Sequence, residues 1–126
     1  MRLLVDSHVA LWWLDGHDSL GPQCSSALET ADEVFFSAVT PWELGIKHLL
    51  GKLSFPDGLV DALVESGFVG LPIDVDHAVS AAELAPHHRD PFDRMLVAQA
   101  VAETLTLVTA DRTLEPYDVP ILDARA

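Results

Sequence analysis

Cysteines and long apolar runs are scarce in this chain, and each scarcity excludes a class of protein. Cysteine occurs once among the 126 residues, at Cys24, which excludes an intramolecular disulfide and a cysteine-built zinc site. There is no run of 18 or more apolar residues, so the sequence offers no transmembrane helix. The N-terminal segment meets an acid at Asp6, too early for a secretory signal peptide. We therefore expect a reducing, cytoplasmic setting.

Basic residues are also few. Seven lysines and arginines stand against 20 aspartates and glutamates, which gives a formal net charge of −13. Proteins that bind nucleic acid through its phosphates usually present a basic surface, so the charge balance by itself argues against nucleic acid as a partner. It favours a basic partner protein, bound cations or solubility alone.

Apolar residues, by contrast, make up 49% of the chain and form short runs that alternate with helical patterns. Residues 1–126 are enough for one domain with a real core. We expect strands at 3–5, 34–36, 69–73, 105–108 and 120–122, with helices at 8–14, 23–30, 40–50, 59–65, 76–84 and 91–103. Apolar strands separated by helices are typical of a parallel sheet covered on both faces. The predicted fold class is α/β, a three-layer α/β/α sandwich.

Four acids fall near the ends of these elements. Asp6 and Asp111 follow the first and fourth strands, Glu43 lies early in the helix after the second strand, and Asp93 opens the helix before the fourth. In such sheets the reactive groups gather outside the carboxyl ends of the strands. Four carboxylates in one pocket repel one another, and a divalent cation relieves that repulsion. Oxygen ligands suit Mg²⁺ or Mn²⁺, and these ions promote phosphodiester hydrolysis.

Each acid also has a purely structural interpretation as a helix cap. In the stretch 40–43, Thr40 fits an N-cap with Glu43 reaching back to it as a capping box. Asp90 fits an N-cap of the helix that follows it, Asp111 fits a turn or cap, and Asp6 fits a cap of the first helix. Caps explain each acid singly, but they do not explain why all four fall at one end of the sheet.

Four blocks of the sequence resemble the PIN-domain ribonuclease toxins of the VapC family. They are LLVDSHVALWWL, SAVTPWELGIKHLLGKL, HHRDPFDRMLVAQA and LVTADRTLEPY, in the family's order and spacing. The resemblance implies a single PIN-like domain with a five-stranded parallel sheet. It also implies a Mg²⁺- or Mn²⁺-dependent endoribonuclease that acts on RNA as the toxin of a type II toxin–antitoxin pair. A homodimer and inhibition by a cognate VapB-type antitoxin are implied as well.

The four acids match the family's acidic positions, and the resemblance implies catalytic and metal-binding roles for them. Asp6 and Asp93 would be direct metal ligands. Glu43 would be a ligand or would orient the attacking water. Asp111 would complete the shell, directly or through water, or hold a second ion.

Other positions near these acids carry subsidiary expectations. Ser7 is expected to hydrogen-bond to a carboxylate or a phosphate, and Asp90 to act first as a helix cap and second as an outer-shell group. Arg112 is placed to touch substrate phosphate, or else to pair with nearby acids as an exposed cation. It would belong to a small basic border round the acidic site, which suits a short, structured RNA and also includes Arg89, Arg94, Lys47 and Lys52. The doublet His87–His88 is expected to be exposed to solvent.

Other functions fit parts of the pattern. A phosphoacceptor receiver domain needs a lysine at the end of the fifth strand, and none follows Leu122. A phosphatase of the haloacid dehalogenase type needs Asp-x-Asp after the first strand, where this chain has Asp6-Ser7-His8. The remaining alternative is a non-catalytic acidic binding module for a basic partner protein, in which the carboxylates serve only as caps.

Overall fold

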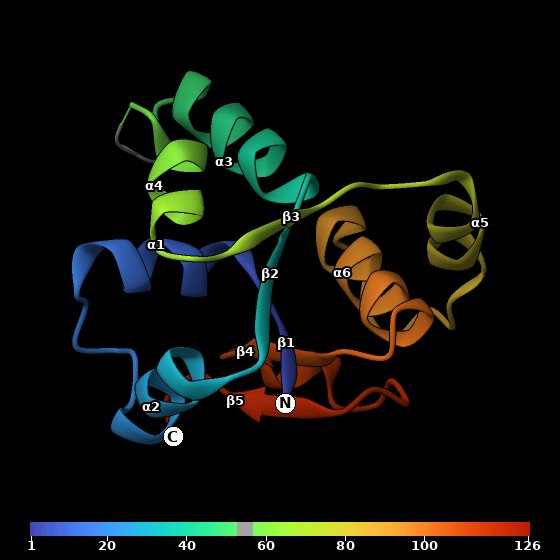
Figure 1. Ribbon diagram of the computed structural model, residues 1–126. Helices are drawn as coiled ribbons and strands as arrows, with labels where there is room; N and C mark the ends of the chain where they lie inside the picture. The colour runs from blue at the N-terminus through green and yellow to red at the C-terminus, as the bar shows by residue number, and fades with distance from the viewer. Residues whose placement is uncertain (53–56) are drawn as a thin grey trace.

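The computed structural model describes residues 1–52 and 57–126, and its centre is a parallel sheet of five strands (Figure 1). The strands are β1 (Arg2–Val5), β2 (Glu33–Ser37), β3 (Val69–Leu71), β4 (Thr106–Thr109) and β5 (Ile121–Asp123). The helices are α1 (Ser7–Asp15), α2 (Pro22–Thr30), α3 (Val39–Leu49), α4 (Leu59–Glu65), α5 (Val75–Glu83) and α6 (Pro91–Ala102), with a short 3-10 helix η1 (Arg112–Leu114). The predicted α/β class and the five parallel strands are confirmed. Leu53, the last residue of the second quoted block, lies outside the described residues.

The strand order is β3-β2-β1-β4-β5, so the first strand of the chain lies at the centre of the sheet. Leu4 of β1 is in register with Phe35 of β2 on one side and with Leu107 of β4 on the other. The chain runs outward from β1 through β2 to β3, and then returns to the other side of β1 to form β4 and β5. Such a reversal opens a crevice at the carboxyl ends of the central strands.

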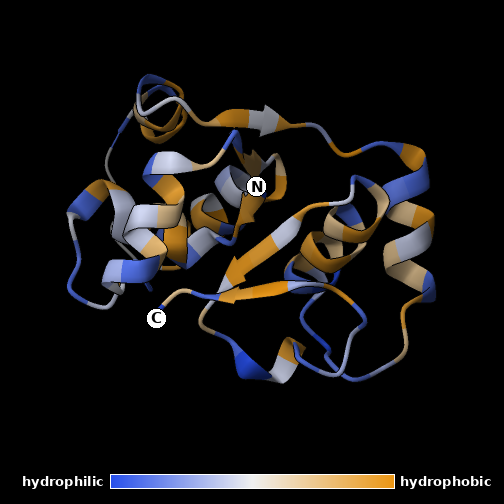
Figure 2. Ribbon diagram, turned by 60° about the horizontal axis from the view of Figure 1, so that its bottom comes forward, coloured by the Kyte–Doolittle hydropathy of each residue, from blue (hydrophilic) through white to orange (hydrophobic). Residues whose placement is uncertain are grey.

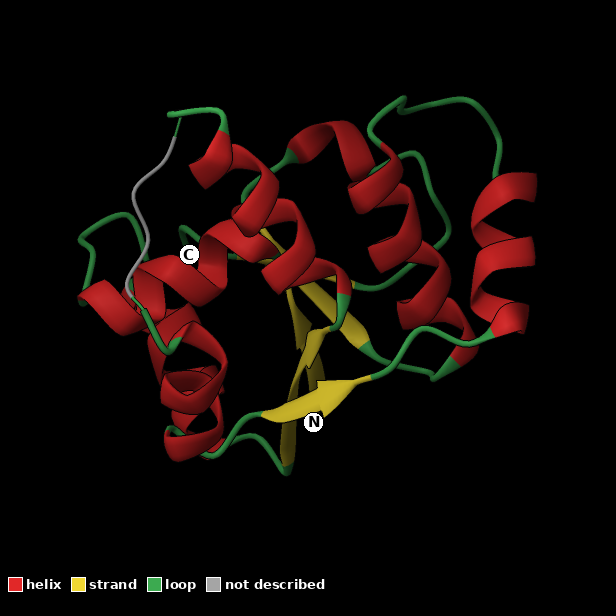
Figure 3. Ribbon diagram, turned by 90° about the horizontal axis from the view of Figure 1, so that it is seen from above, coloured by secondary structure: helices red, strands yellow, loops and turns green. Residues whose placement is uncertain are grey.

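Alternate residues of the central strands enter two different hydrophobic cores, because successive side chains of a strand point to opposite faces. Leu3 and Val5 pack with buried residues of α1, α2 and α4, whereas Leu4 packs with α6 on the other face. β2 repeats this, with Phe36 in the first core and Phe35 in the second. Helices accordingly flank the sheet on both sides (Figure 3), and the strands are mostly hydrophobic (Figure 2). Burial on both faces explains why the strands read as continuous apolar runs.

The start of α3 differs from the prediction. The helix begins at Val39 with Ala38 as its N-cap and without a side-chain cap. The hydroxyl of Ser37 accepts the Val39 amide hydrogen at 3.0 Å, so the chain turns into the helix as soon as β2 ends. Thr40 therefore lies inside the helix, and the capping-box interpretation of Thr40 and Glu43 is wrong.

Among the residues that the structure describes, none of the helices has both the length and the apolar character needed to span a membrane.

Candidate active site

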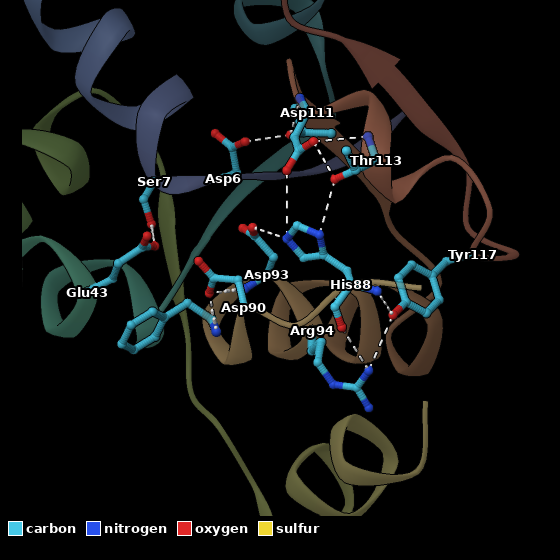
Figure 4. Close-up of polar contacts among 12 residues, drawn as sticks. Asp6, Ser7, Glu43, His88, Asp90, Asp93, Arg94, Asp111, Thr113 and Tyr117 are labelled. Atoms are coloured by element: carbon cyan, nitrogen blue, oxygen red, sulfur yellow. Dashed lines mark hydrogen bonds and ion pairs between the residues drawn. The ribbon is translucent and has the colours of Figure 1, made fainter. Parts of the chain in front are cut away.

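A hollow of about 290 Å³ opens at the carboxyl ends of β1 and β4, and five of its eleven lining residues are acids. The lining residues are Asp6, Ser7, His8, Trp12, Glu43, Lys47, Asp90, Asp93, Ala110, Asp111 and Arg125. All four acids with predicted roles are among them, and Asp90 lies beside these four. The acids come from separate segments of the chain and surround one space (Figure 4).

Asp6 leaves the end of β1 and is 7% exposed. Its Oδ1 accepts the amide hydrogen of Val9 at 2.8 Å, which caps α1. Its Oδ2 accepts the hydroxyl hydrogen of Thr109, at the end of β4, at 2.6 Å. Burial raises the pKa of Asp6 above its ordinary value, although both hydrogen bonds act in the opposite direction. The protein thus places an acid where ionisation is costly unless positive charge arrives.

Glu43 is 4% exposed and is held from two sides. Its Oε1 accepts the hydroxyl hydrogen of Ser7 at 2.7 Å, and its Oε2 lies 2.8 Å from Nζ of Lys47. Ser7 Oγ also lies 3.2 Å from Oγ1 of Thr40. Partial burial acts to lower the pKa of Lys47, but the contact with Glu43 outweighs it and raises that pKa. The sequence interpretation placed Lys47, four residues after Glu43, in the basic border; the same spacing on one helix is the signal for the ion pair that the structure shows.

Asp90 and Asp93 open α6 and have different partners. Asp90 Oδ1 accepts the amide hydrogens of Phe92 at 2.8 Å and Asp93 at 3.3 Å, so Asp90 caps the helix while lining the hollow. Asp93 Oδ2 lies 2.8 Å from Nε2 of His88. Partial burial raises the pKa of Asp93 to about 6; the hydrogen bond with His88 opposes the rise, and the nearby charges of Asp90 and Glu43 add to it.

Asp111 follows β4 and caps η1. Its Oδ1 accepts the amide hydrogen of Thr113 at 2.9 Å and the hydroxyl hydrogen of Thr113 at 2.6 Å. Partial burial acts to raise the pKa of Asp111, but the hydrogen bonds from Thr113 outweigh it and lower that pKa. Oδ2 of Asp111 lies 3.8 Å from Nε2 of His88.

Capping explains some of these acids but not all of them. Asp6, Asp90 and Asp111 are N-caps, as the structural interpretation expected. Glu43 lies inside α3 and caps nothing, and the side chain of Asp93 meets an imidazole rather than a backbone amide. A cap-only account therefore leaves the buried Glu43 unexplained.

Two arginines of the expected basic border lie elsewhere. Arg112 is 83% exposed and does not line the hollow; its nearest acid is Asp123, 4.0 Å away, in line with the alternative of an exposed cation near acids. Arg94 turns away from the hollow and donates to backbone oxygens at the end of α5, including those of Ala81 at 2.9 Å and Leu84 at 2.8 Å. The placement of Arg94 in the border is wrong, because the guanidinium satisfies the last carbonyls of a helix.

The expectation for the histidine doublet holds for one residue and fails for the other. His87 is exposed, with its ring edge-on to Tyr117 at 5.1 Å between centroids. His88 is only 18% exposed because its ring lies between Asp93 and Asp111 (Figure 4). The sequence carries no local signal for this contact, since Asp111 lies 23 residues further along the chain.

Known proteins resemble the chain over nearly its whole length. The model of the PIN domain family matches residues 3–120. Ribonuclease VapC22 of Mycobacterium tuberculosis is 32% identical in sequence over 94% of this chain and 93% of that protein. The chain therefore belongs to the PIN-domain family, and within it to the VapC proteins.

Solved structures share the same fold. A crystal structure of VapBC2 from Rickettsia felis bound to a DNA fragment from their promoter matches with a TM-score of 0.72 at 14% identity, over 97% of this chain and 98% of that one. A crystal structure of DNA-bound VapBC from Salmonella typhimurium matches with a TM-score of 0.70 at 20% identity, over 98% of each chain.

Proposed function

We propose that this chain is a divalent-cation-dependent endoribonuclease, the toxin of a type II toxin–antitoxin pair, which hydrolyses phosphodiester bonds in structured RNA. The observation that carries the proposal is the gathering of Asp6, Glu43, Asp93 and Asp111, from four separate segments, around one hollow. The name of the similar Ribonuclease VapC22 supports the same chemistry.

The residues present fit a hard divalent cation. The four acids offer carboxylate oxygens, the ligands that Mg²⁺ and Mn²⁺ take in proteins. Burial raises the pKa values of Asp6 and Asp93, so positive charge between them would relieve a real electrostatic cost. Asp6 and Asp93 would hold the ion directly, with Glu43 and Asp111 completing its surroundings. A bound Mg²⁺ or Mn²⁺ supplies Lewis-acid charge that stabilises the negative charge developing during hydrolysis.

The side chains around the hollow hold these carboxylates in place before substrate arrives. Ser7 and Lys47 each hold one oxygen of the Glu43 carboxylate. The carboxylate is thereby held in position to orient an attacking water. Thr109 and the start of α1 fix both oxygens of Asp6. Such preorganisation lets charged groups act without rearranging during the reaction. Lys47 and Arg125 are the two basic side chains, histidines aside, among the lining residues, and either is placed to meet a phosphate.

The charge of the chain also suits the proposed partner. With a net charge of −13 and an acidic hollow, the protein would attract a basic segment of a VapB-type antitoxin, which would inhibit it by entering the hollow. The VapBC complexes with this fold from Rickettsia felis and Salmonella typhimurium support a partner of this kind.

We also propose that the free toxin is a homodimer, as its resemblance to the VapC family implies.

Cleavage of a panel of structured RNAs tests the proposal. The wild type should cleave in Mg²⁺ or Mn²⁺ and stop in EDTA, and Asp6→Asn should lower the rate by about 100-fold or more, since a charge on the reacting centre is lost. Asp118→Asn, an exposed acid outside the hollow, is the matched control and should cleave as the wild type does. Cleavage that survives Asp6→Asn would come from a contaminating nuclease and would overturn the proposal.

The alternative is the acidic binding module, which the three capping aspartates favour. It predicts tight binding to a basic partner, together with no cation-dependent cleavage and no thermal stabilisation by Mg²⁺ or Mn²⁺. The wild type in Mg²⁺ and in EDTA therefore separates the two functions.

A further inference from the structure

The imidazole of His88 has a place among the acids that the proposed function does not use. Its Nε2 lies 2.8 Å from Oδ2 of Asp93 and 3.8 Å from Oδ2 of Asp111 (Figure 4). These three side chains form a group whose ligand atoms all lie within 4.8 Å of one another. They are 18%, 21% and 35% exposed, so the group is open enough to admit an ion and is not a loose surface cluster.

The hydrogen bonds around His88 determine which ring nitrogen carries the hydrogen. The hydroxyl of Thr113 has one hydrogen, which it donates to Oδ1 of Asp111 at 2.6 Å. The same hydroxyl oxygen must then accept from Nδ1 of His88, 3.1 Å away. In the neutral ring this leaves Nε2 with a lone pair that faces the two carboxylates. A lone pair and a carboxylate oxygen 2.8 Å apart need a proton or a cation between them, so a bound cation would take the place of the proton in the hydrogen bond between His88 and Asp93.

This is also how proteins prepare a histidine to bind a metal ion. A ligating imidazole usually donates its other N–H to an oxygen that fixes the ring, and here the oxygen belongs to Thr113, which in turn bonds Asp111. The backbone of His88 is anchored as well. Its amide donates to the hydroxyl of Tyr117 at 3.1 Å, and its carbonyl accepts from Arg94 at 3.2 Å.

The spacing suits an ion of ordinary size. Two ligands each about 2.1 Å from one ion lie roughly 3.0–3.4 Å apart at octahedral or tetrahedral angles. The two distances from Nε2, 2.8 and 3.8 Å, bracket that range, so small side-chain shifts would complete the site.

We propose that Nε2 of His88, with one carboxylate oxygen each from Asp93 and Asp111, forms a second divalent-cation position beside the all-oxygen position of Asp6 and Glu43. Asp93 is shared between the two positions. The inference rests on the proposed function in so far as Asp93 and Asp111 act there as ligands. A nitrogen ligand favours Mn²⁺ over Mg²⁺, because Mg²⁺ takes oxygen almost exclusively. Of the two ions of the proposed function, Mn²⁺ is therefore the one with which the second position is tested.

The proposed His88 site is tested by binding Mn²⁺ to the full chain and monitoring the binding by electron spin echo spectroscopy and by calorimetry. The wild type should show nitrogen coupling to bound Mn²⁺. His88→Asn keeps a polar atom near the place of Nδ1 and removes Nε2; it should lose the coupling and one Mn²⁺ per chain, or bind that ion at least about tenfold more weakly. His87→Asn and His8→Asn are the matched controls, one from the exposed neighbour and one from the rim of the hollow. Both should keep the coupling.

The outcomes separate the two proposals. Bound Mn²⁺ without nitrogen coupling in the wild type, or coupling that survives in His88→Asn, overturns the His88 site. Coupling with no cation-dependent cleavage of any RNA overturns the endoribonuclease and leaves the site. Should His88→Asn fail to fold, wild type labelled with ¹⁵N-histidine tests the kind of ligand, since a coupling that stays ¹⁴N is not from histidine and overturns the proposal. Loss of the coupling in His8→Asn would reassign it and overturn the proposal.

Discussion

Nζ of Lys47 lies 2.8 Å from Oε2 of Glu43, one turn along the same helix, at the wall of the acidic hollow. Glu43 is 4% exposed, so water has little access to its carboxylate. The ammonium of Lys47 supplies the hydrogen bond and the positive charge that water would otherwise provide around Oε2. The pair is thus both a structural contact and part of the candidate active site. Removing the ammonium of Lys47 should therefore lower the free energy of unfolding by a measurable amount.

Lys47→Met should lower the free energy of unfolding by about 1–2 kcal/mol in EDTA, because a buried carboxylate loses its charged partner. Mn²⁺ should restore part of this loss, since a cation near Glu43 replaces the missing charge. Urea unfolding with and without Mn²⁺ measures both effects. Lys52→Met, at an exposed lysine beyond the end of α3, should change stability by no more than about 0.5 kcal/mol. Equal losses in both variants would contradict the role given to the ion pair.

Asp93→Asn should stabilise the metal-free protein at neutral pH. The pKa of Asp93 is raised from 3.8 to about 6 in the folded state. The protonated form of Asp93 is the one that the folded state favours. The stability that this raised pKa contributes is therefore complete below pH 3.8 and is lost as the pH rises through about 6. The neutral amide avoids this loss, so the variant should gain about 1–2 kcal/mol at pH 7 in EDTA and almost nothing at pH 4. Asp90→Ala should instead lose about 1 kcal/mol at pH 7, because it removes a helix cap. A gain equal at both pH values would rule out the titration of Asp93 as the cause.

Cation binding should weaken in acid. Mn²⁺ must displace the proton from Asp93, so its affinity should fall by about tenfold for each pH unit below about 6 and be nearly constant above pH 7. Calorimetry at pH 5, 6, 7 and 8 measures this. An affinity unchanged down to pH 5 would show that Asp93 is not a ligand.

Arg94→Lys should destabilise the fold rather than weaken RNA binding. The guanidinium donates to backbone oxygens of Ala81, Leu84 and His88, and a lysine ammonium cannot span them all. We expect a loss of about 2 kcal/mol in urea unfolding. Arg89→Lys, at an exposed position, should leave stability unchanged within about 0.5 kcal/mol. RNA binding that weakens in Arg94→Lys with stability intact would return Arg94 to the basic border.

Local sequence patterns were sufficient to predict the helices and strands and the capping role of several acids. The apolar runs predicted the strands because each central strand is buried on both faces, and the predicted helices agree with the observed ones to within a few residues. Asp90 was predicted as a cap, and it is one, because capping depends on amides two and three residues away. Thr40 shows where such reasoning fails: Ser37, outside the supposed box, provides the contact at the start of α3.

Hydrophobic periodicity and the geometry of parallel sheets were enough to predict the fold class, the order of its elements and the acids at strand ends. The side-chain partners became known only from the packed structure: Ser7 with Glu43, Thr109 with Asp6, and His88 with Asp93 and Asp111. Ser7 and Glu43, and likewise Thr109 and Asp6, are far apart in the chain and meet because β1 lies between β2 and β4. A polar side chain carries no periodic signal of its partner, so only the packed sheet decides whether it faces solvent or the hollow.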